Sequence, residues 1–247
     1  MSHLENSSDD HFINLTLNTQ MALPESRDTL LHFFDQVKKN YPGMTNFYGR
    51  DSSDFVLEED KESPSYRWVS TEKRRIFSGH VNPETSDDAI TLHHLILELI
   101  PYSLSVSELD CESMNLTYGF DFNFCGNQNQ LLADALGFHP AFESLAHLPD
   151  IALLRNEPSL EFTFGEESQV QCRLSIETRT NAYHVRTGNY PDDQLSVYLT
   201  ARHTGSLEGG ETFHTLLDRL NLACTALVEG HLVEHVLQPL QQAIAIQ

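Results

Sequence analysis

The chain has 247 residues, is 40% hydrophobic and carries a formal net charge of -21, from 36 acidic and 15 basic residues. This hydrophobic content is enough for a packed core, so a wholly disordered chain is excluded. The acidity argues against a nucleic-acid-binding protein, whose affinity comes from Lys and Arg on phosphates, and against anionic membrane surfaces. The charge favours solubility, or attraction of a basic protein partner.

The cysteines and the N-terminus indicate the compartment. Cys111, Cys125, Cys172 and Cys224 are far apart and form no CxxC motif, so neither a zinc knuckle nor a redox pair is indicated. Residues 1–11 are polar and acidic, lack the features of a signal peptide, and are predicted to be a disordered tail. No apolar run is long enough to span a bilayer. We therefore expect a cytoplasmic protein with reduced thiols.

In the first half, residues 13–18 alternate between apolar and polar, which predicts a half-buried strand. A helix is predicted from Pro24-Glu25-Ser26 to the stop signal at residues 40–43. Strands are then predicted at 55–57, 66–69 and 74–81, the last two joined by a turn at 71–73. A second helix follows residues 82–86 and is expected to end at Pro101.

The second half begins with the clearest strand, Met114 to Phe124, in which every second residue is apolar. A helix through Leu136 follows, and then a linker-like stretch at 138–158. Alternation at 160–164 and 170–176 predicts a hairpin, and 195–201 a further strand. From Gly209 the sequence is helical almost to its end, with Gly230 and Pro239 as candidate breaks.

The second half appears as a repeat of the first. Ile13 to Leu17 (INLTL) aligns with Met114 to Tyr118 (MNLTY), and residues 76–80 (IFSGH) align with residues 199–203 (LTARH). Both halves, 12–110 and 111–247, are predicted to be β-α-β-β-β-α units. Such units form antiparallel sheets with helices on one face, in the α+β class. The alternative is a chance similarity between two unrelated α+β domains.

In the order of its elements the chain resembles the TATA-binding-protein-like (helix-grip) topology, a duplicated sheet gripped by helices. This resemblance implies a pseudo-two-fold protein whose two sheets can join edge to edge in one curved saddle. No sequence motif of that family is present. The nucleic-acid activity of the family is not carried over, because the basic saddle that it requires is missing from this acidic chain.

Six residues are candidates for ligand binding. Asn115, Asp121 and Asn123 share the polar face of the strongest strand, for which plain solvent exposure is the alternative. Arg173 is expected on the polar face of its own strand, where it could meet an anionic ligand. His80 and His203 end equivalent strands of the two repeats and could lie near each other or at the mouths of symmetric pockets. The alternative is that these histidines have no chemical role.

Residues 231–235 read HLVEH, which matches the inverted zinc-peptidase motif HxxEH. On a helix, His231 and His235 lie one turn apart and can share a metal, with Glu234 beside them as a possible base. Nothing in the sequence indicates a third ligand, so an exposed polar stripe is the alternative. A run of acids between Asp51 and Glu62 is interpreted as a solvated strand edge, because charges at an edge oppose aggregation.

No P-loop, GxGxxG, GxSxG or HExxH motif is present, which argues against an enzyme, although a site built from scattered residues would escape such a search. No cofactor is predicted. We expect a non-catalytic binding protein that contacts a basic protein partner. One alternative is a small-molecule-binding domain with its pocket between the curved sheet and the C-terminal helices. Another is a metal-dependent enzyme using His231 and His235. A monomer and a homodimer are both compatible with the sequence.

Overall fold

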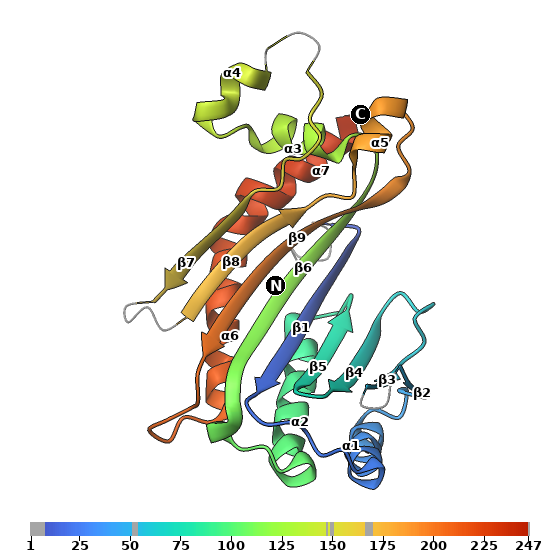
Figure 1. Cartoon of the computed structure of the whole chain (residues 1–247), viewed down its shortest axis with the longest axis vertical. Coiled ribbons are helices and arrows are strands. Elements are labelled where there is room, and N and C mark those ends of the chain that lie inside the picture. The colour runs from blue at the N-terminus through green and yellow to red at the C-terminus, as the bar shows by residue number, and fades with distance from the viewer. Residues whose placement is uncertain (1–7, 51–53, 147, 149–150, 166–169, 247) are drawn as a thin grey trace.

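The computed structural model describes residues 8–50, 54–146, 148, 151–165 and 170–246. Its strands form one antiparallel sheet, against which helices pack (Figure 1). The first half contributes β1 (Asp10–Thr19), α1 (Arg27–Asn40), β2 (Asn46–Gly49), β3 (Phe55–Glu58), β4 (Tyr66–Glu72), β5 (Arg75–Val81) and α2 (Ser86–Leu104). The α+β class predicted from the sequence is confirmed at this level.

The second half begins with a short 3-10 turn, η1 (Glu108–Asp110), and with β6 (Cys111–Cys125). It continues with α3 (Gln128–Leu136), η2 (Pro140–Phe142), α4 (Glu143–Ala146), β7 (Ser159–Phe164), β8 (Val170–Glu177), α5 (Ala182–Thr187), β9 (Asp192–Thr204), α6 (Phe213–Leu227), the π-helix η3 (Val228–Leu237) and α7 (Gln238–Ile246).

The strand order is symmetric about its centre. It runs β2-β3-β4-β5-β1-β6-β9-β8-β7, so that β1 and β6, the first strands of the two halves, are neighbours. The register has the same symmetry. Ile13 pairs with His80, and Met114, which the repeat aligns with Ile13, pairs with His203. Leu15 pairs with Leu116, the residue that the sequence alignment of the two halves sets against it, so the register of the central strands is symmetric about this pair.

Several sequence-based boundaries are corrected. β1 begins at Asp10, so the predicted disordered tail does not extend to residue 11; residues 1–7 lie outside the described part of the chain. Helix α2 does not end at Pro101 but continues to Leu104, and Ser105 closes it in the left-handed region (φ 55°). A proline removes one hydrogen bond from a helix, and here the buried residues Ile100 and Leu104 keep the last turn packed.

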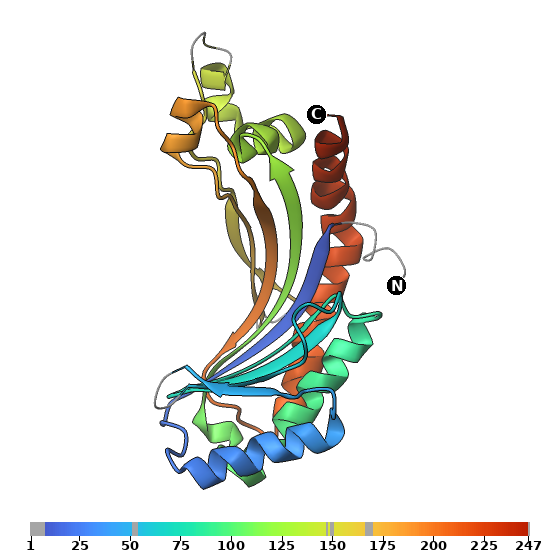
Figure 2. The same cartoon turned by 90° about the vertical axis from the view of Figure 1, so that its right-hand side faces the viewer.

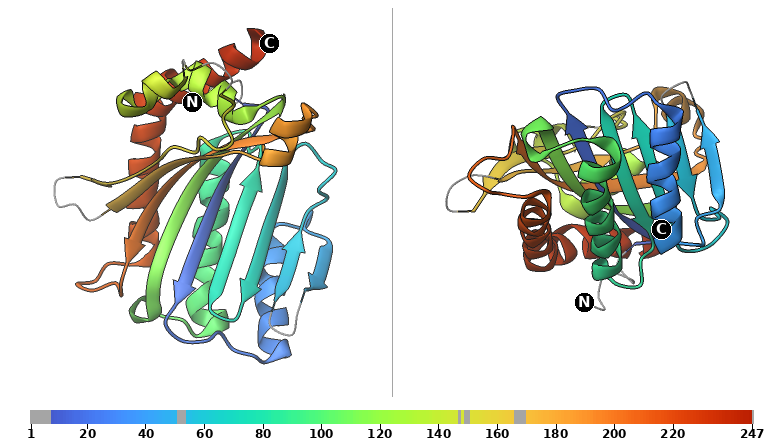
Figure 3. Two further views of the ribbon diagram at one scale, coloured as in Figure 1. Left: turned by 45° about the horizontal axis from the view of Figure 1, so that its top comes forward. Right: turned by 90° about the horizontal axis from the view of Figure 1, so that it is seen from below.

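The long helices α1, α2 and α6 lie on one face of the sheet. Figure 2 shows the sheet bent away from them, with α2 and α6 against its outer side. In Figure 3 (right) α1, α2 and α6 lie side by side along that face. The elements that the sequence did not reveal, β2 and α5, are short. The predicted linker contains only η2 and the one-turn α4 within the residues that the structure describes.

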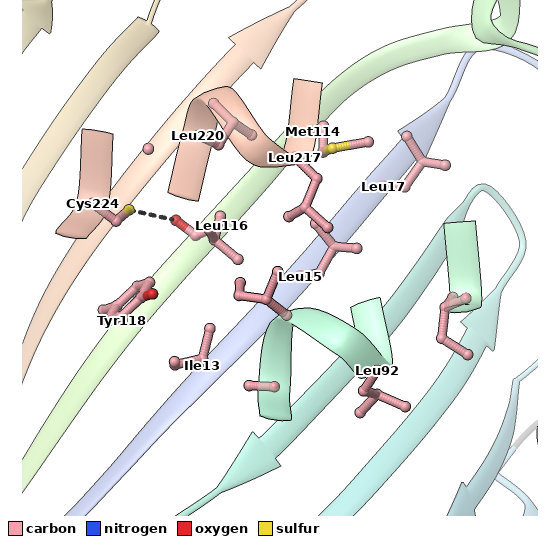
Figure 4. Packing of buried hydrophobic residues seen from close by; sticks show 14 of the residues in the cluster. Ile13, Leu15, Leu17, Leu92, Met114, Leu116, Tyr118, Leu217, Leu220 and Cys224 are labelled. Atoms are coloured by element: carbon pink, nitrogen blue, oxygen red, sulfur yellow. Dashed lines mark hydrogen bonds between the residues drawn. The ribbon is translucent and has the colours of Figure 1, made fainter. Parts of the chain in front are cut away.

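Apolar side chains fill the space between the sheet and the helices. Alternate residues of β1 (Ile13, Leu15 and Leu17) and of β6 (Met114, Leu116 and Tyr118) meet Leu92 of α2 and Leu217, Leu220 and Cys224 of α6 (Figure 4). All are at most 2% exposed. The Tyr118 hydroxyl donates to Asn221 Oδ1 at 2.7 Å, so its burial leaves no polar group unpaired.

Candidate functional site

The face of the sheet opposite α1, α2 and α6 is uncovered along most of its length, and we call it the open face (Figure 3, left). Because side chains alternate along a strand, it carries the residues that are not in the core. The middle of this face consists of half-buried residues of the two central strands, namely Phe12, Asn14 and Thr16 of β1 and Asn115, Thr117 and Asp121 of β6. Figure 2 shows that the bend of the sheet makes the open face concave.

Two strand glycines allow aromatic rings to lie on the open face. A Cβ on Gly79 would be 2.3 Å from Trp68 Nε1, and one on Gly119 would be 2.1 Å from Phe12 Cζ. Real Cβ atoms do not come so close, so both strands need glycine at these positions. The Phe12 ring also lies near that of Tyr198, with 6.1 Å between centroids. The result is an aromatic surface on one side of the sheet.

Three acceptor atoms of the open face are buried without a hydrogen-bond partner among the described residues. They are Asn14 Oδ1, Asn115 Oδ1 and Asp121 Oδ1. Asn14 and Asn115, which the alignment of the two halves sets against each other, lie on either side of the Leu15–Leu116 pair. Buried acceptors without partners cost free energy, and in native proteins they call for an explanation such as a bound molecule.

Each of the two asparagines lines a hollow of about 500 Å³. The basic hollow is lined by Asn115, Glu161, Phe162, Thr163, Gln171, Cys172, Arg173, Thr200 and Arg202. Its guanidinium groups come from β8 and β9, and Arg173 lies 3.8 Å from Glu161. The Thr200 hydroxyl contacts that of Thr117 at 2.9 Å. A cationic region is therefore present on this strongly acidic protein.

The aromatic hollow lies on the other side of the Leu15–Leu116 pair from the basic hollow. It is lined by Asp10, Phe12, Asn14, Lys61, Ser63, Pro64, Tyr66, Trp68, Val81, Asn82, Asp121 and Gln194. Asp121 is flanked by Asp10 on the neighbouring strand. Burial raises the pKa of Asp121 above its usual range; the Ser196 hydroxyl opposes this, Asp10 adds to it, and Arg179 lowers it again. The hollow is thus aromatic and acidic.

The structure separates the six predicted ligand-binding residues into four places. Asn115 and Arg173 line the basic hollow, and Asp121 lines the aromatic one. Asn123 is exposed beyond both, and its backbone N–H donates to Asp9 Oδ2 at 2.6 Å. His80 and His203 lie on the helix-covered side instead.

The expectation that His80 and His203 could lie near each other is not met. The strands that carry them, β5 and β9, are separated by β1 and β6. His80 is 2% exposed, its Nε2 lies 3.2 Å from Ser65 Oγ, and burial lowers its pKa to about 4. His203 lies beside Arg219. Burial is the main cause that lowers the pKa of His203, and the positive charge of Arg219 lowers it further. The two histidines therefore lie on either side of the central pair of strands, β1 and β6.

A second buried histidine lies close to His80. His93 of α2 is fully buried, and its Nδ1 is 2.7 Å from Ser78 Oγ on β5. Burial lowers the pKa of His93 to about 3. Both rings are therefore neutral at physiological pH and serve as polar members of the core.

The HxxEH residues lie within the π-helix η3. His231 and His235 are exposed, with 4.7 Å between their ring centroids. Throughout the described ranges, no group of three or more His, Cys, Asp or Glu side chains is placed to hold a metal ion. π-helical turns often mark functional sites, but this segment offers two histidines on solvent and no enclosed coordination site.

Within the described residues the acidic run is solvated in part, since Asp60 and Glu62 are exposed whereas Glu58 is buried and Glu59 half-buried. Asp51 lies outside the described residues. Glu58 is 6% exposed and pairs with Lys61 at 3.0 Å, and Glu59 pairs with Arg67 at 3.1 Å. These acids stabilise the β3–β4 region through ion pairs instead of repelling neighbours at a free edge.

Sequence reasoning missed Phe12, Asn14, Trp68 and Arg202. Asn14 could have been found from the repeat, since it aligns with the predicted Asn115. Gly79 and Gly119 were a second signal, because glycine inside a strand often marks a close approach of another group. Trp68 and Arg202 carry no such signal and depend on the sheet register.

Comparison with known proteins gave no assignment: no protein-family model matches the chain, and no curated sequence is significantly similar to it. Within the described residues, no helix is both long and apolar enough to cross a membrane. The function is therefore argued from the geometry of the open face.

Proposed function

We propose that this is a non-catalytic binding protein whose open face receives a segment of a basic partner protein. The observation that carries the proposal is the pair of repeat-equivalent acceptors, Asn14 Oδ1 and Asn115 Oδ1, buried without partners on an uncovered face. Acceptors of this kind are satisfied by N–H donors, which peptide backbones and basic side chains supply. The net charge of -21 attracts a basic partner over distance.

The rest of the open face supports this proposal. Aromatic rings at Phe12, Trp68 and Tyr198 offer the amphipathic contact area that is typical of protein-binding surfaces. The arginines of the basic hollow add sites for acidic groups of the same partner. An acidic mimic of a nucleic acid would instead need its charge gathered on one face. Here acids lie on both layers, for example Asp28 and Asp218 on helices and Glu161 on the sheet.

The finer fold assignment belongs to the same proposal. A gene duplication accounts for the symmetric strand order and for the equivalent pairs Ile13–His80 and Met114–His203. The curved sheet with helices on one side is what the TATA-binding-protein-like (helix-grip) topology implies. In such a protein the uncovered side of the sheet is available for binding, which agrees with the site proposed here.

Affinity capture tests the proposal. The tagged wild-type chain and an Asn14→Ala/Asn115→Ala variant are used to capture proteins from a lysate of the source cells at low and high salt, with mass-spectrometric detection. A basic protein that wild type retains at low salt should be lost at high salt and be recovered at least ten-fold less with the variant. A Gln238→Ala/Gln242→Ala variant, changed at two exposed polar residues of α7, is the control.

The variant must also remain folded. Removing a buried acceptor that has no partner costs little stability, so urea unfolding of the open-face variant should match wild type within about 1 kcal/mol. Equal recovery of the basic protein by wild type and by the open-face variant would contradict the proposal.

A small-molecule ligand is the second candidate, favoured by the size of the two hollows. Volumes of about 500 Å³ fall in the range of ligand pockets. These hollows lie on the open face, whereas the space between the sheet and the C-terminal helices is filled by core side chains (Figure 4). A thermal-shift screen of metabolites, with the Asn14→Ala/Asn115→Ala variant as the comparison, tests this candidate.

A further inference from the structure

The aromatic hollow combines two kinds of group that attract an organic cation. The rings of Phe12, Tyr66 and Trp68 line it, and the faces of aromatic rings carry negative electrostatic potential. The carboxylates of Asp10 and Asp121 line the same space. A site with both features selects a positively charged group that can also lie against a ring.

Asp10 and Asp121 are directly opposite each other on β1 and β6, with both side chains on the open face. Like charges in this position repel. Asp10 Oδ1 accepts a hydrogen bond from Asn82 Nδ2 at 2.7 Å, whereas Asp121 Oδ1 is buried without a partner. Asn14 Oδ1, also without a partner, lines the same hollow. Both oxygen atoms are therefore available to N–H donors of a ligand.

The rim of the hollow is held in place by Asn82, which adopts a left-handed backbone conformation (φ 47°). Its amide nitrogen donates to Asp10 Oδ1 and to the Pro64 carbonyl, and its amide oxygen accepts from the His11 N–H at 2.8 Å. A conformation that costs energy is kept here by three hydrogen bonds to two neighbouring segments. The hollow is thus preorganised before any ligand arrives.

Lys61 is the cation among the described residues that line the hollow. Its Nζ lies 3.0 Å from Glu58 Oε2, so its charge is balanced outside the Asp10–Asp121 pair. Arg179, whose charge lowers the pKa of Asp121, is paired with Glu177 at 3.6 Å. Within the described residues, neither Asp10 nor Asp121 forms an ion pair with a lysine or an arginine.

We propose that the aromatic hollow binds the guanidinium group of an arginine side chain from the partner polypeptide. A guanidinium is planar, carries five N–H donors, pairs with a carboxylate through two parallel bonds and stacks on aromatic rings. Asp121 and Asn14 offer the acceptors, and Trp68 or Phe12 offers the ring. A lysine ammonium provides fewer donors and no planar face, so it fits less well. This inference rests on the proposed function and specifies which partner residue the open face recognises.

The chain contains a single tryptophan, Trp68, so its fluorescence reports on the hollow directly. Full-length protein is titrated with blocked tripeptides Gly-X-Gly in which X is arginine, lysine or citrulline, the neutral analogue of arginine. We expect a saturable change with the arginine peptide, at least ten-fold weaker binding of the citrulline peptide and several-fold weaker binding of the lysine peptide.

Two variants locate the site. Asp121→Asn should weaken binding of the arginine peptide at least ten-fold, while Glu234→Gln, which removes one charge from the exposed π-helix, should change it less than two-fold. Because Asp121→Asn relieves a like-charge contact, it should fold normally, which far-UV circular dichroism checks; Asp10→Asn is the second variant. Equal affinities for the arginine and citrulline peptides, no saturable change, or unchanged binding by Asp121→Asn and Asp10→Asn would overturn the inference.

The peptide titration and the affinity capture fail independently. If the arginine peptide does not bind but recovery of a basic protein still depends on Asn14 and Asn115, this inference is wrong and the proposed function stands. If the peptide binds as expected but no partner depends on the open face, the arginine site stands and the proposed function is wrong.

Discussion

His94 of α2 and His214 of α6 place their Nδ1 atoms 2.8 Å apart, with the rings stacked at 5.0 Å between centroids. One nitrogen must donate and the other accept, so at least one of the two rings is neutral. Asp218 Oδ1 accepts from His94 Nε2 at 2.9 Å. This contact joins the helix of the first half to that of the second.

The link between His94 and Asp218 should be measurable but small. Asp218 is 65% exposed and His94 30% exposed at the side chain, so solvent screens the pair. We expect a coupling of about 0.2–1 kcal/mol from a double-mutant cycle of His94→Ala and Asp218→Ala in urea unfolding at pH 7. A coupling near zero would show that the two halves are held together by the core alone.

The buried histidines should make the protein sensitive to mild acid. The pKa values of His80 and His93 are about 4 and about 3 in the folded state, below the ordinary value of 6.5. Below pH 6.5 the unfolded chain takes up protons that the folded chain does not. Each histidine should therefore lower the free energy of unfolding by about 1.4 kcal/mol per pH unit, down to its folded pKa.

Urea unfolding between pH 5 and 7.5 tests this. The His80→Gln variant should show a shallower fall of stability with acid than wild type, and His235→Gln, at an exposed position, should not. Identical slopes for wild type and His80→Gln would contradict the assignment of His80 as a neutral core residue.

Substitution of Gly79 should disturb the aromatic surface. The added Cβ of Gly79→Ala would meet Trp68 Nε1 and Asn14 Oδ1 at 2.3 Å, so the indole must move. We expect a loss of about 1–3 kcal/mol in stability and a shifted Trp68 emission maximum. Gly230→Ala is the comparison, because nothing lies within 4 Å of its added Cβ. It should be neutral or slightly stabilising.

The four thiols should differ sharply in reactivity. Cys125 is exposed, whereas Cys111, Cys172 and Cys224 are buried, and burial raises the pKa of Cys111 to about 12. A thiol must be accessible and ionised to react. A disulfide reagent should modify Cys125 alone in the native protein and all four cysteines after unfolding, as peptide mass spectrometry would show. Rapid native labelling of Cys224 would mean that α6 separates from the sheet.

The fold was predictable where alternation was strong or where the repeat supplied a second copy of a pattern. β6 shows eleven residues of alternation, and the alignment of Ile13 with Met114 matches the observed register. Sequence failed where local signals conflict with packing. Pro101 is a stop signal, but buried neighbours continue α2 past it. β2 is four residues long, which is too short for an alternation of apolar and polar residues to be recognised.

The site was predictable only in part. Asn115, Asp121 and Arg173 were placed on the polar side of their strands by alternation, and the structure locates all three in hollows of the open face. Their neighbours depend on which strands pair. Trp68 on β4 and Asn14 on β1 both pair with Gly79 on β5, the strand between them. The side chains of Trp68 and Asn14 approach each other over this glycine because it has no side chain. No local pattern specifies such a contact.

The position of β1 has a consequence for synthesis of the protein. β1 is a central strand, and its partner β6 emerges from the ribosome only after β5 and α2. Until then β1 is an open edge, which can pair with other chains. The register between β1 and β6 is symmetric about Leu15 and Leu116. Two copies of residues 8–110 can therefore form an equivalent antiparallel pair in which β1 of one copy takes the place of β6 beside β1 of the other. Sedimentation of that fragment should reveal a dimer, and the full-length chain carries the second copy of this interface within itself.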